Sequence, residues 1–176
     1  MQTISMARAT IVAAAILGAA HVASIAQPLG DRAQGVGSNP ASTIDELRQA
    51  ADRGDTRAQD KLAEIYATGQ GVAQDDHAAV AWWTRAANSG DAKAQSVLGL
   101  EYVAGTRVGR DYNAALAWFR KGADQGDALS QAWLGLMFRG QYAGIARDDA
   151  ASAHWYRQAA DQGYASSQAI LGNLYA

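Results

Sequence analysis

The sequence predicts an all-α fold, a solenoid of antiparallel helix pairs with about 36 residues per pair. The first observation is a recurring stretch: AWWTRAANSGDAKAQSVLGLEY at 81–102 returns as AWFRKGADQGDALSQAWLGLMF at 117–138 and as HWYRQAADQGYASSQAILGNLY at 154–175. The second is another copy, ELRQAADRGDTRAQDKLAEIY, at 46–66. The third is register, since glycine, glutamine, leucine and an aromatic residue keep their places in every copy. Units of this kind stack on one another and share a continuous core.

Each unit is expected to hold a first helix, A, and a second helix, B. Aspartate precedes most of these helices, and its side chain can accept hydrogen bonds from the free amides of a first helical turn. The first B helix is instead expected to start at a capping box formed by Thr43 and Glu46. The A helices are predicted at about 56–67, 92–103, 128–139 and 165–175, after the caps Asp55, Asp91 and Asp127, with Tyr164 departing from the pattern. The B helices are predicted at about 44–53, 76–88, 112–124 and 149–161, the last three after the caps Asp75, Asp111 and Asp148.

Glycine recurs inside the A helices, where it costs about 1 kcal/mol relative to alanine. The residues are Gly99, Gly135 and Gly172, while the first unit has Ala63. We expect the missing side chain to admit a ring from a B helix. The expected rings are Trp82, Trp118 and Trp155, and together with Trp83 they are interpreted as core and inter-unit packing residues rather than as carbohydrate-stacking ones.

The N-terminal segment differs from the repeats. Residues 1–26 combine Arg8, a short apolar run and a small-x-small exit at Ser24 and Ala26, which is typical of a secretory signal peptide. The alternative is an uncleaved membrane anchor, although a span needs about 20 apolar residues. Residues 27–42 hold both prolines and predict a flexible linker, with an ordered wrap over the first unit as the alternative. The solenoid is then predicted over 43–176, with units at about 55–90, 91–126 and 127–163 and half-units at both ends, in a periplasmic or secreted protein.

Composition argues against several classes of protein. The formal net charge of −2 lacks the basic footprint of a nucleic-acid binder. The absence of cysteine excludes thiolate metal sites and cysteine nucleophiles. His77 follows Asp75 and Asp76, which could bind a metal weakly, but a solvated helix start is the favoured interpretation. No phosphate loop, zinc spacing or serine elbow occurs. We therefore predict no catalytic residue, no metal and no cofactor.

The repeat resembles a known family. The pattern Ala-x-x-Gly-(Asp)-Ala-x-Ala-Gln-x-x-Leu-Gly-x-x-Tyr is typical of Sel1-like repeats, a subgroup of the tetratricopeptide-like solenoids. The stretch 78–128 matches that pattern almost throughout, and the resemblance covers about 43–176. It implies a right-handed superhelix whose A helices line the concave surface. It also implies an adaptor role, often in exported bacterial proteins. The β-lactamase-like activity described for cysteine-rich relatives is not carried over to a chain without cysteine.

One stripe of the A helices is a candidate for partner binding. It is charged in the first unit and apolar in the third. We expect Trp133 to lie at the centre of an exposed apolar patch, as hot-spot residues do. Alternatively, tight curvature buries Trp133 between adjacent A helices. The predicted binding residues are Leu100, Leu129, Trp133 and Leu136 as an apolar anchor, with Arg57, Lys61 and Lys93 as a polar end.

These observations predict a non-enzymatic scaffold of the bacterial envelope or secreted space that binds a protein or peptide on its concave face. The alternative is a glycan-binding accessory protein or enzyme acting on cell-wall or exopolysaccharide material. Asp60 and Glu64 could serve as its carboxylate pair, although they resemble a salt-bridged face. No nucleic acid is expected as a partner, and a membrane only if the signal segment is uncleaved. The last half-unit leaves a possible homo-oligomer contact.

Overall fold

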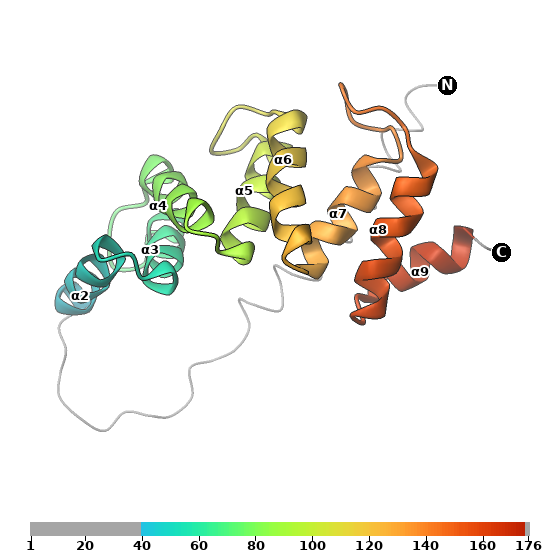
Figure 1. The fold of residues 1–176 in the computed structure, drawn as a ribbon. Helices are drawn as coiled ribbons and strands as arrows, with labels where there is room; N and C mark the ends of the chain where they lie inside the picture. The colour runs from blue at the N-terminus through green and yellow to red at the C-terminus, as the bar shows by residue number, and fades with distance from the viewer. Residues whose placement is uncertain (1–39, 175–176) are drawn as a thin grey trace.

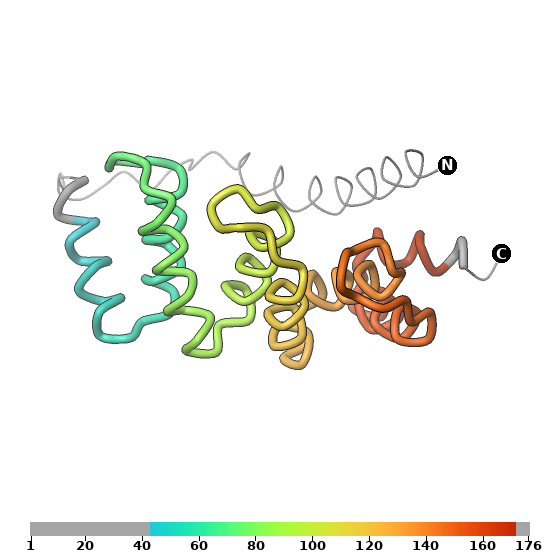
Figure 2. The backbone as a smooth tube through the Cα atoms, turned by 90° about the horizontal axis from the view of Figure 1, so that it is seen from above, coloured from blue at the N-terminus to red at the C-terminus, as the bar shows by residue number. Residues whose placement is uncertain are grey.

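The computed structural model describes residues 40–174, and every regular element in this range is an α-helix. The helices follow one another along an elongated row from α2 to α9 (Figure 1), and the view from above shows the same order (Figure 2). The predicted all-α solenoid is therefore confirmed. The helices are α2 (Pro40–Asp52), α3 (Thr56–Thr68), α4 (Asp76–Asn88), α5 (Ala92–Ala104), α6 (Tyr112–Asp124), α7 (Ala128–Met137), α8 (Asp149–Asp161) and α9 (Ala165–Leu174).

The predicted helix bounds hold closely, with one clear exception. The B helices α4, α6 and α8 have the predicted ranges, whereas α7 ends two residues early. Helix α2 begins at Pro40 rather than at Ile44, so the predicted start at the Thr43 capping box is wrong. Proline is favoured in a first helical turn because it has no amide to leave unpaired. The predicted signal segment and most of the predicted linker lie outside the described residues.

The predicted aspartate caps are confirmed. The carboxylates of Asp55, Asp75, Asp91, Asp111, Asp127 and Asp148 accept hydrogen bonds from backbone amides of the following first turn. Between each B helix and the next A helix, the chain turns at a glycine with φ between 84° and 96°, a region that glycine enters without a steric cost. These glycines are Gly54, Gly90, Gly126 and Gly163. Local signals in the sequence thus set where the helices α3 to α8 begin and where the B helices end.

Rings from the B helices α6 and α8 enter gaps in the preceding A helices, but they are not the predicted rings. A Cβ added to Gly99 would lie 2.5 Å from the Phe119 ring, and one added to Gly135 would lie 2.8 Å from the Tyr156 ring. Phe119 and Tyr156 are both fully buried. Each follows the expected tryptophan by one residue, a rotation of about 100° around the helix. The prediction that Trp118 and Trp155 fill the gaps is therefore wrong.

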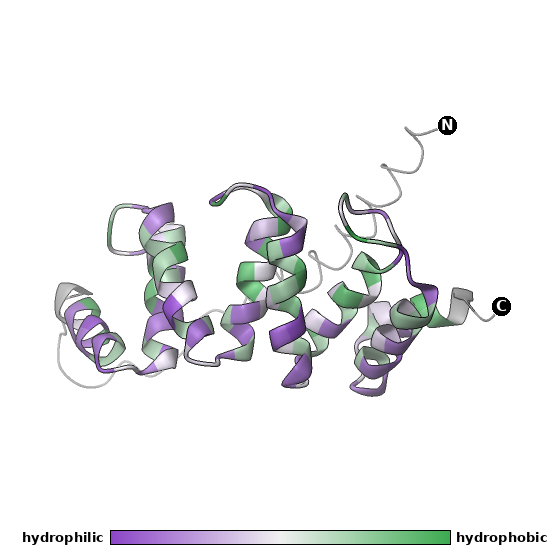
Figure 3. Ribbon diagram, turned by 45° about the horizontal axis from the view of Figure 1, so that its top comes forward, coloured by the Kyte–Doolittle hydropathy of each residue, from purple (hydrophilic) through white to green (hydrophobic). Residues whose placement is uncertain are grey.

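The tryptophans that precede these rings by one residue in the sequence pack between units instead. Trp82, Trp118 and Trp155 are half-buried against the core clusters, and Trp82 touches two clusters at once. The next residue, Trp83, lies in the core. The broader interpretation of these rings as packing residues is confirmed. Apolar and polar residues share every helix (Figure 3), so the core runs along the row rather than around one centre.

Glutamines, the first three of them buried, join each A helix to the end of the preceding B helix. Their side-chain amides donate to the carbonyls of Ala51, Ala87, Ala123 and Ala160, from Gln59, Gln95, Gln131 and Gln168 respectively, at 2.9, 2.9, 3.4 and 3.1 Å. At two of these glutamines, a second glutamine at the C-terminal cap of the next B helix supplies a further hydrogen bond. Gln125 donates to Gln95 Oε1, and Gln162 donates to Gln131 Oε1, both at 2.8 Å.

The first site lacks this second glutamine. Ser89 stands at the position of Gln125 and Gln162, and the Oε1 atom of Gln59 is buried without a hydrogen-bond partner among the described residues. The backbone at Ser89 already has nearly the conformation that carries a glutamine at the equivalent position. Ser89 has φ −79° and ψ 1°, and Gln125 has φ −91° and ψ 2°.

Ser89→Gln is therefore expected to stabilise the fold by about 1 kcal/mol, the usual net value of a hydrogen bond. The quantity to measure is the midpoint of chemical unfolding, which should rise. The matched control Gln125→Ser should lower it by a similar amount. An unfolding midpoint that falls in Ser89→Gln would show that a glutamine at this position does not donate to Gln59 Oε1.

Candidate partner-binding surface

Trp133, the expected centre of the binding patch, is buried. Its exposed fraction is 0%, and its ring stacks on Phe119 with centroids 5.4 Å apart and planes 5° from parallel. Leu136 is also buried, at 1% exposure. The prediction that these two residues form an exposed anchor is wrong, and the alternative of burial is correct. The physical reason is that α7 lies against both α6 and α5, which leaves no free face at this point.

Lys93, assigned to the polar end, instead joins two A helices. Its ammonium donates to Asp60 at 2.6 Å and to Glu64 at 2.9 Å, which links α5 to α3. Burial acts to lower the pKa of Lys93, but the hydrogen bonds that its ammonium donates to the two carboxylates outweigh burial, and the pKa is raised. Both carboxylates of the suggested hydrolytic pair are thus engaged in a structural contact.

The same inter-unit contact is apolar one unit further on. The repeat places Leu129 where Lys93 stands, and Ser96 and Leu100 where Asp60 and Glu64 stand. Leu100 and Leu129 are half-buried and pack against the cluster that holds Trp133. The stripe becomes apolar along the row because its residues become buried: Lys61 is exposed, its equivalent Val97 is half-exposed, and Trp133 is buried.

The accessible part of the stripe therefore lies on α3 and α5. Arg57 and Lys61 are exposed, and neither side chain has a hydrogen bond or ion pair in the part of the chain that the structure describes. Val97 and Leu100 are half-exposed on the adjoining helix. We call Arg57, Lys61, Val97 and Leu100 the A surface, with Leu129 at its edge. It offers two unpaired cations beside an apolar strip, which suits a carboxylate followed by an apolar side chain.

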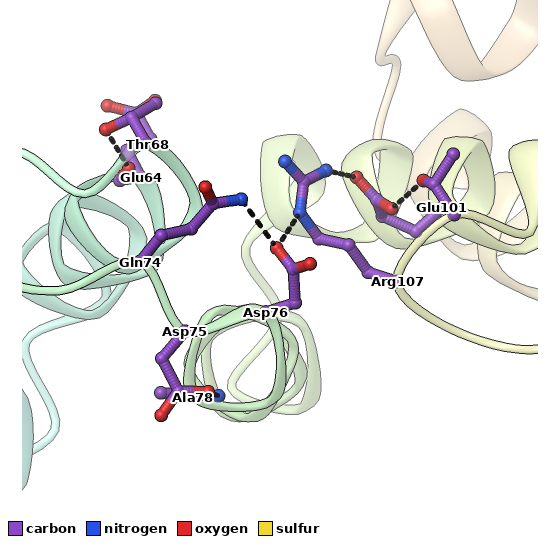
Figure 4. Close-up of polar contacts among 9 residues, drawn as sticks. Glu64, Thr68, Gln74, Asp75, Asp76, Ala78, Glu101 and Arg107 are labelled. Atoms are coloured by element: carbon purple, nitrogen blue, oxygen red, sulfur yellow. Dashed lines mark hydrogen bonds and ion pairs between the residues drawn. The ribbon is translucent and has the colours of Figure 1, made fainter.

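The other candidate for chemistry, the Asp75–Asp76–His77 run, serves the fold. Asp75 caps α4 through the amide of Ala78 at 2.9 Å. Asp76 accepts hydrogen bonds from Arg107 at 2.9 Å and Gln74 at 3.3 Å, as Figure 4 shows.

Arg107 ties the loop after α5 back to the start of α4. Besides binding Asp76, it donates to the buried Glu101 at 2.6 Å. Across residues 40–174, no group of three or more histidine, cysteine, aspartate or glutamate side chains is placed to hold a metal ion. In the same range, no helix is both long and apolar enough to cross a membrane.

The B helices carry a feature that the sequence analysis missed. Arg85 lies over the ring of Trp82, 4.6 Å from its centroid, and Lys121 lies over Trp118 at 4.0 Å. A base three residues after a tryptophan is the sequence signal, because residues at this spacing are neighbours on a helix surface. The last B helix, α8, has Gln158 at the position of Arg85 and Lys121.

Comparison with known proteins agrees with this architecture. The family model described as the Sel1 repeat matches residues 56–91, 92–127 and 128–164. A Sel1 repeat protein from Oxalobacter formigenes is 33% identical, with a TM-score of 0.70, over 74% of this chain and 98% of that chain. The protective antigen c5321 of uropathogenic Escherichia coli, which displays an SLR fold, is 36% identical with a TM-score of 0.73, over 79% of this chain and 29% of that one.

A more distant likeness extends to the cysteine-rich protein B of Helicobacter pylori. It is 16% identical, with a TM-score of 0.57 over 76% of this chain and 100% of that chain, and shares the fold alone. A search of curated proteins found no match. The three matched repeats follow the three helix pairs α3–α4, α5–α6 and α7–α8, and the chain therefore belongs to the Sel1 repeat family.

Proposed function

We propose that this chain is a non-enzymatic scaffold that binds a segment of a protein partner on its A surface, outside the cytoplasm. Sel1 repeats generally mediate protein–protein interactions, and proteins built from them are typically scaffolds without enzymatic activity. The observation that carries the proposal is the pair of unpaired cations, Arg57 and Lys61, beside the half-exposed Val97 and Leu100. A partner segment with a carboxylate next to apolar side chains would satisfy both parts of this surface.

The glycan alternative has less support. Trp133, the ring expected to stack on a sugar, is buried. Asp60 and Glu64, the carboxylates expected to act on the sugar, accept hydrogen bonds from Lys93. The interpretation as a glycan-binding protein or enzyme depended on these three side chains. We therefore retain it only as an outcome of the experiment below.

Export is proposed from the sequence of residues 1–26, which has the form of a secretory signal peptide. A likeness to a protein described as a protective antigen is in keeping with this location. Cleavage after Ala26 would leave Gln27 as the first residue. Mass spectrometry of the chain recovered from the producing cells would test this, and a recovered chain that still begins at Met1 would contradict it.

Photo-crosslinking tests the binding surface directly. We would place a benzophenone amino acid at Lys61 or Val97 on the A surface, and at the exposed Ala117 on α6 as the control. A discrete protein adduct is expected from positions 61 and 97 and not from 117. The double variant Arg57→Glu, Lys61→Glu should reduce the adduct at 97 several-fold without loss of helicity, since both side chains are exposed.

Three results would count against the proposal. An adduct that forms only at 117 would move the binding site to the B helices. An adduct at 97 that survives the charge reversal would remove the cations from the site. Polydisperse carbohydrate adducts would restore the glycan alternative.

A further inference from the structure

One unit of the solenoid shows a complete cation site between consecutive B helices. The guanidinium of Arg85 lies over the ring of Trp82 and also binds Asp52 at the end of α2, with Nη1 and Oδ1 3.0 Å apart. Ring, cation and carboxylate all come from this chain. The side chains of Arg85 and Asp52 are 48% and 58% exposed, so the site lies at the surface.

The repeat places the same site at two further junctions. At the second, Trp118 keeps its cation, Lys121, but Asn88 stands at the position of Asp52. At the third, the ring is Trp155 and the carboxylate is Asp124, yet the cation is replaced by Gln158. Of these three junctions, only the third has a ring and an acid but no base at the position of Arg85.

Both remaining groups of the third site reach the surface, and the ring of Trp155 meets the neighbouring His154 ring edge to face, with the centroids 5.2 Å apart. Asp124 is exposed and has no hydrogen bond or ion pair within residues 40–174. Gln158 turns to His154, with the two side-chain nitrogens 3.1 Å apart. Trp155 is half-exposed, as is Trp82 in the occupied site. By repeat register, the third junction therefore has a ring and a carboxylate at the two positions that hold the Arg85 guanidinium at the first junction.

We propose that Trp155 and Asp124 form a binding site for an arginine side chain of a partner protein, which would take the place that Arg85 occupies over Trp82. A guanidinium fits better than an ammonium because its plane stacks on an indole while its N–H groups reach a carboxylate. The site is built from α6 and α8 and shares no residue with the A surface, so the two proposals stand or fall separately.

The probe is the peptide acetyl-Gly-Arg-Gly-amide, with the citrulline peptide as its uncharged match. Binding is followed by the NMR signals of the tryptophan indole N–H groups, with Trp155 assigned from the variant Trp155→Phe. We expect the arginine peptide to shift the Trp155 signal in a saturable way and the citrulline peptide to leave it in place. The Trp82 signal should not move, because Arg85 already covers that ring.

Two surface variants separate the site from chance contact. Asp124→Asn should weaken peptide binding about threefold, as expected for an exposed ion pair. Gln158→Arg should abolish the shift, because the chain then supplies its own guanidinium. An equal response to citrulline, equal movement of Trp82, or an undiminished shift in Gln158→Arg would each overturn the proposal.

Discussion

Trp133→Ala is expected to lower the free energy of unfolding by about 3–5 kcal/mol, the usual cost of truncating a buried tryptophan. The side chain is fully buried and stacks on Phe119, so its removal would leave a cavity between α6 and α7. Chemical denaturation followed by far-UV circular dichroism would measure the loss. Repeat arrays can unfold in parts, so the loss of helix should be followed across the whole transition.

Trp118→Ala is the matched control for this prediction. Trp118 is a tryptophan of the same solenoid but is only half-buried, so its truncation should cost less than half as much. The benzophenone adduct at position 97 should persist in any Trp133→Ala protein that remains folded. A stable Trp133→Ala protein that loses this adduct would return Trp133 to the binding surface.

Gly99→Ala is expected to destabilise the fold by about 2 kcal/mol, although alanine is the better helix former. The new Cβ would lie 2.5 Å from Cε1 of Phe119, and that ring is also stacked on Trp133. Neither ring can move without disturbing the next helix. The overpacking therefore outweighs the gain of about 1 kcal/mol in helix propensity. Thermal or chemical unfolding of the single variant would measure the net effect.

The first unit provides the control for this prediction. Ala63 occupies the position of Gly99 and is buried in the same cluster as Trp83. Ala63→Gly should also destabilise the fold, by about 1 kcal/mol, because the helix loses a methyl group and gains backbone freedom. On a solvent-exposed helix face, Gly99→Ala would raise stability. A rise in stability here would therefore show that Phe119 does not approach Gly99 as closely as the structure places it.

The sequence predicted the helices well because their ends are marked locally. An aspartate at the start and a glycine in the turn are enough to place α4, α6 and α8 to the residue. It could not decide which of two adjacent rings faces the partner helix, since Trp82 and Trp83 are both large and apolar. The phase is set by how the helices pack, and only the contacts of Gly99 and Gly135 reveal it.

The exposure of the predicted stripe could not be read from the sequence. Lys61, Val97 and Trp133 are equivalent in sequence, yet their exposure falls from one unit to the next. This depends on the distance between A helices, which no local pattern encodes. The ion pair of Lys93 with Asp60 joins residues 33 apart in the chain, so it too depends on how one unit is staggered on the next.

The change in the stripe from ionic to apolar makes the contact between α3 and α5 different in kind from the contact around α7. The contact of Lys93 with Asp60 and Glu64 is weakened by dissolved salt, because mobile ions screen exposed charges. The contact around Leu129 and Trp133 is not screened, and excluded salts such as sulfate strengthen it. The solenoid thus joins a salt-sensitive contact between α3 and α5 to a contact around α7 that salt does not screen. Arg57 and Lys61 lie on α3, so the proposed A surface stands at the salt-sensitive contact, and dissolved salt acts on both the packing and the charge of the same region.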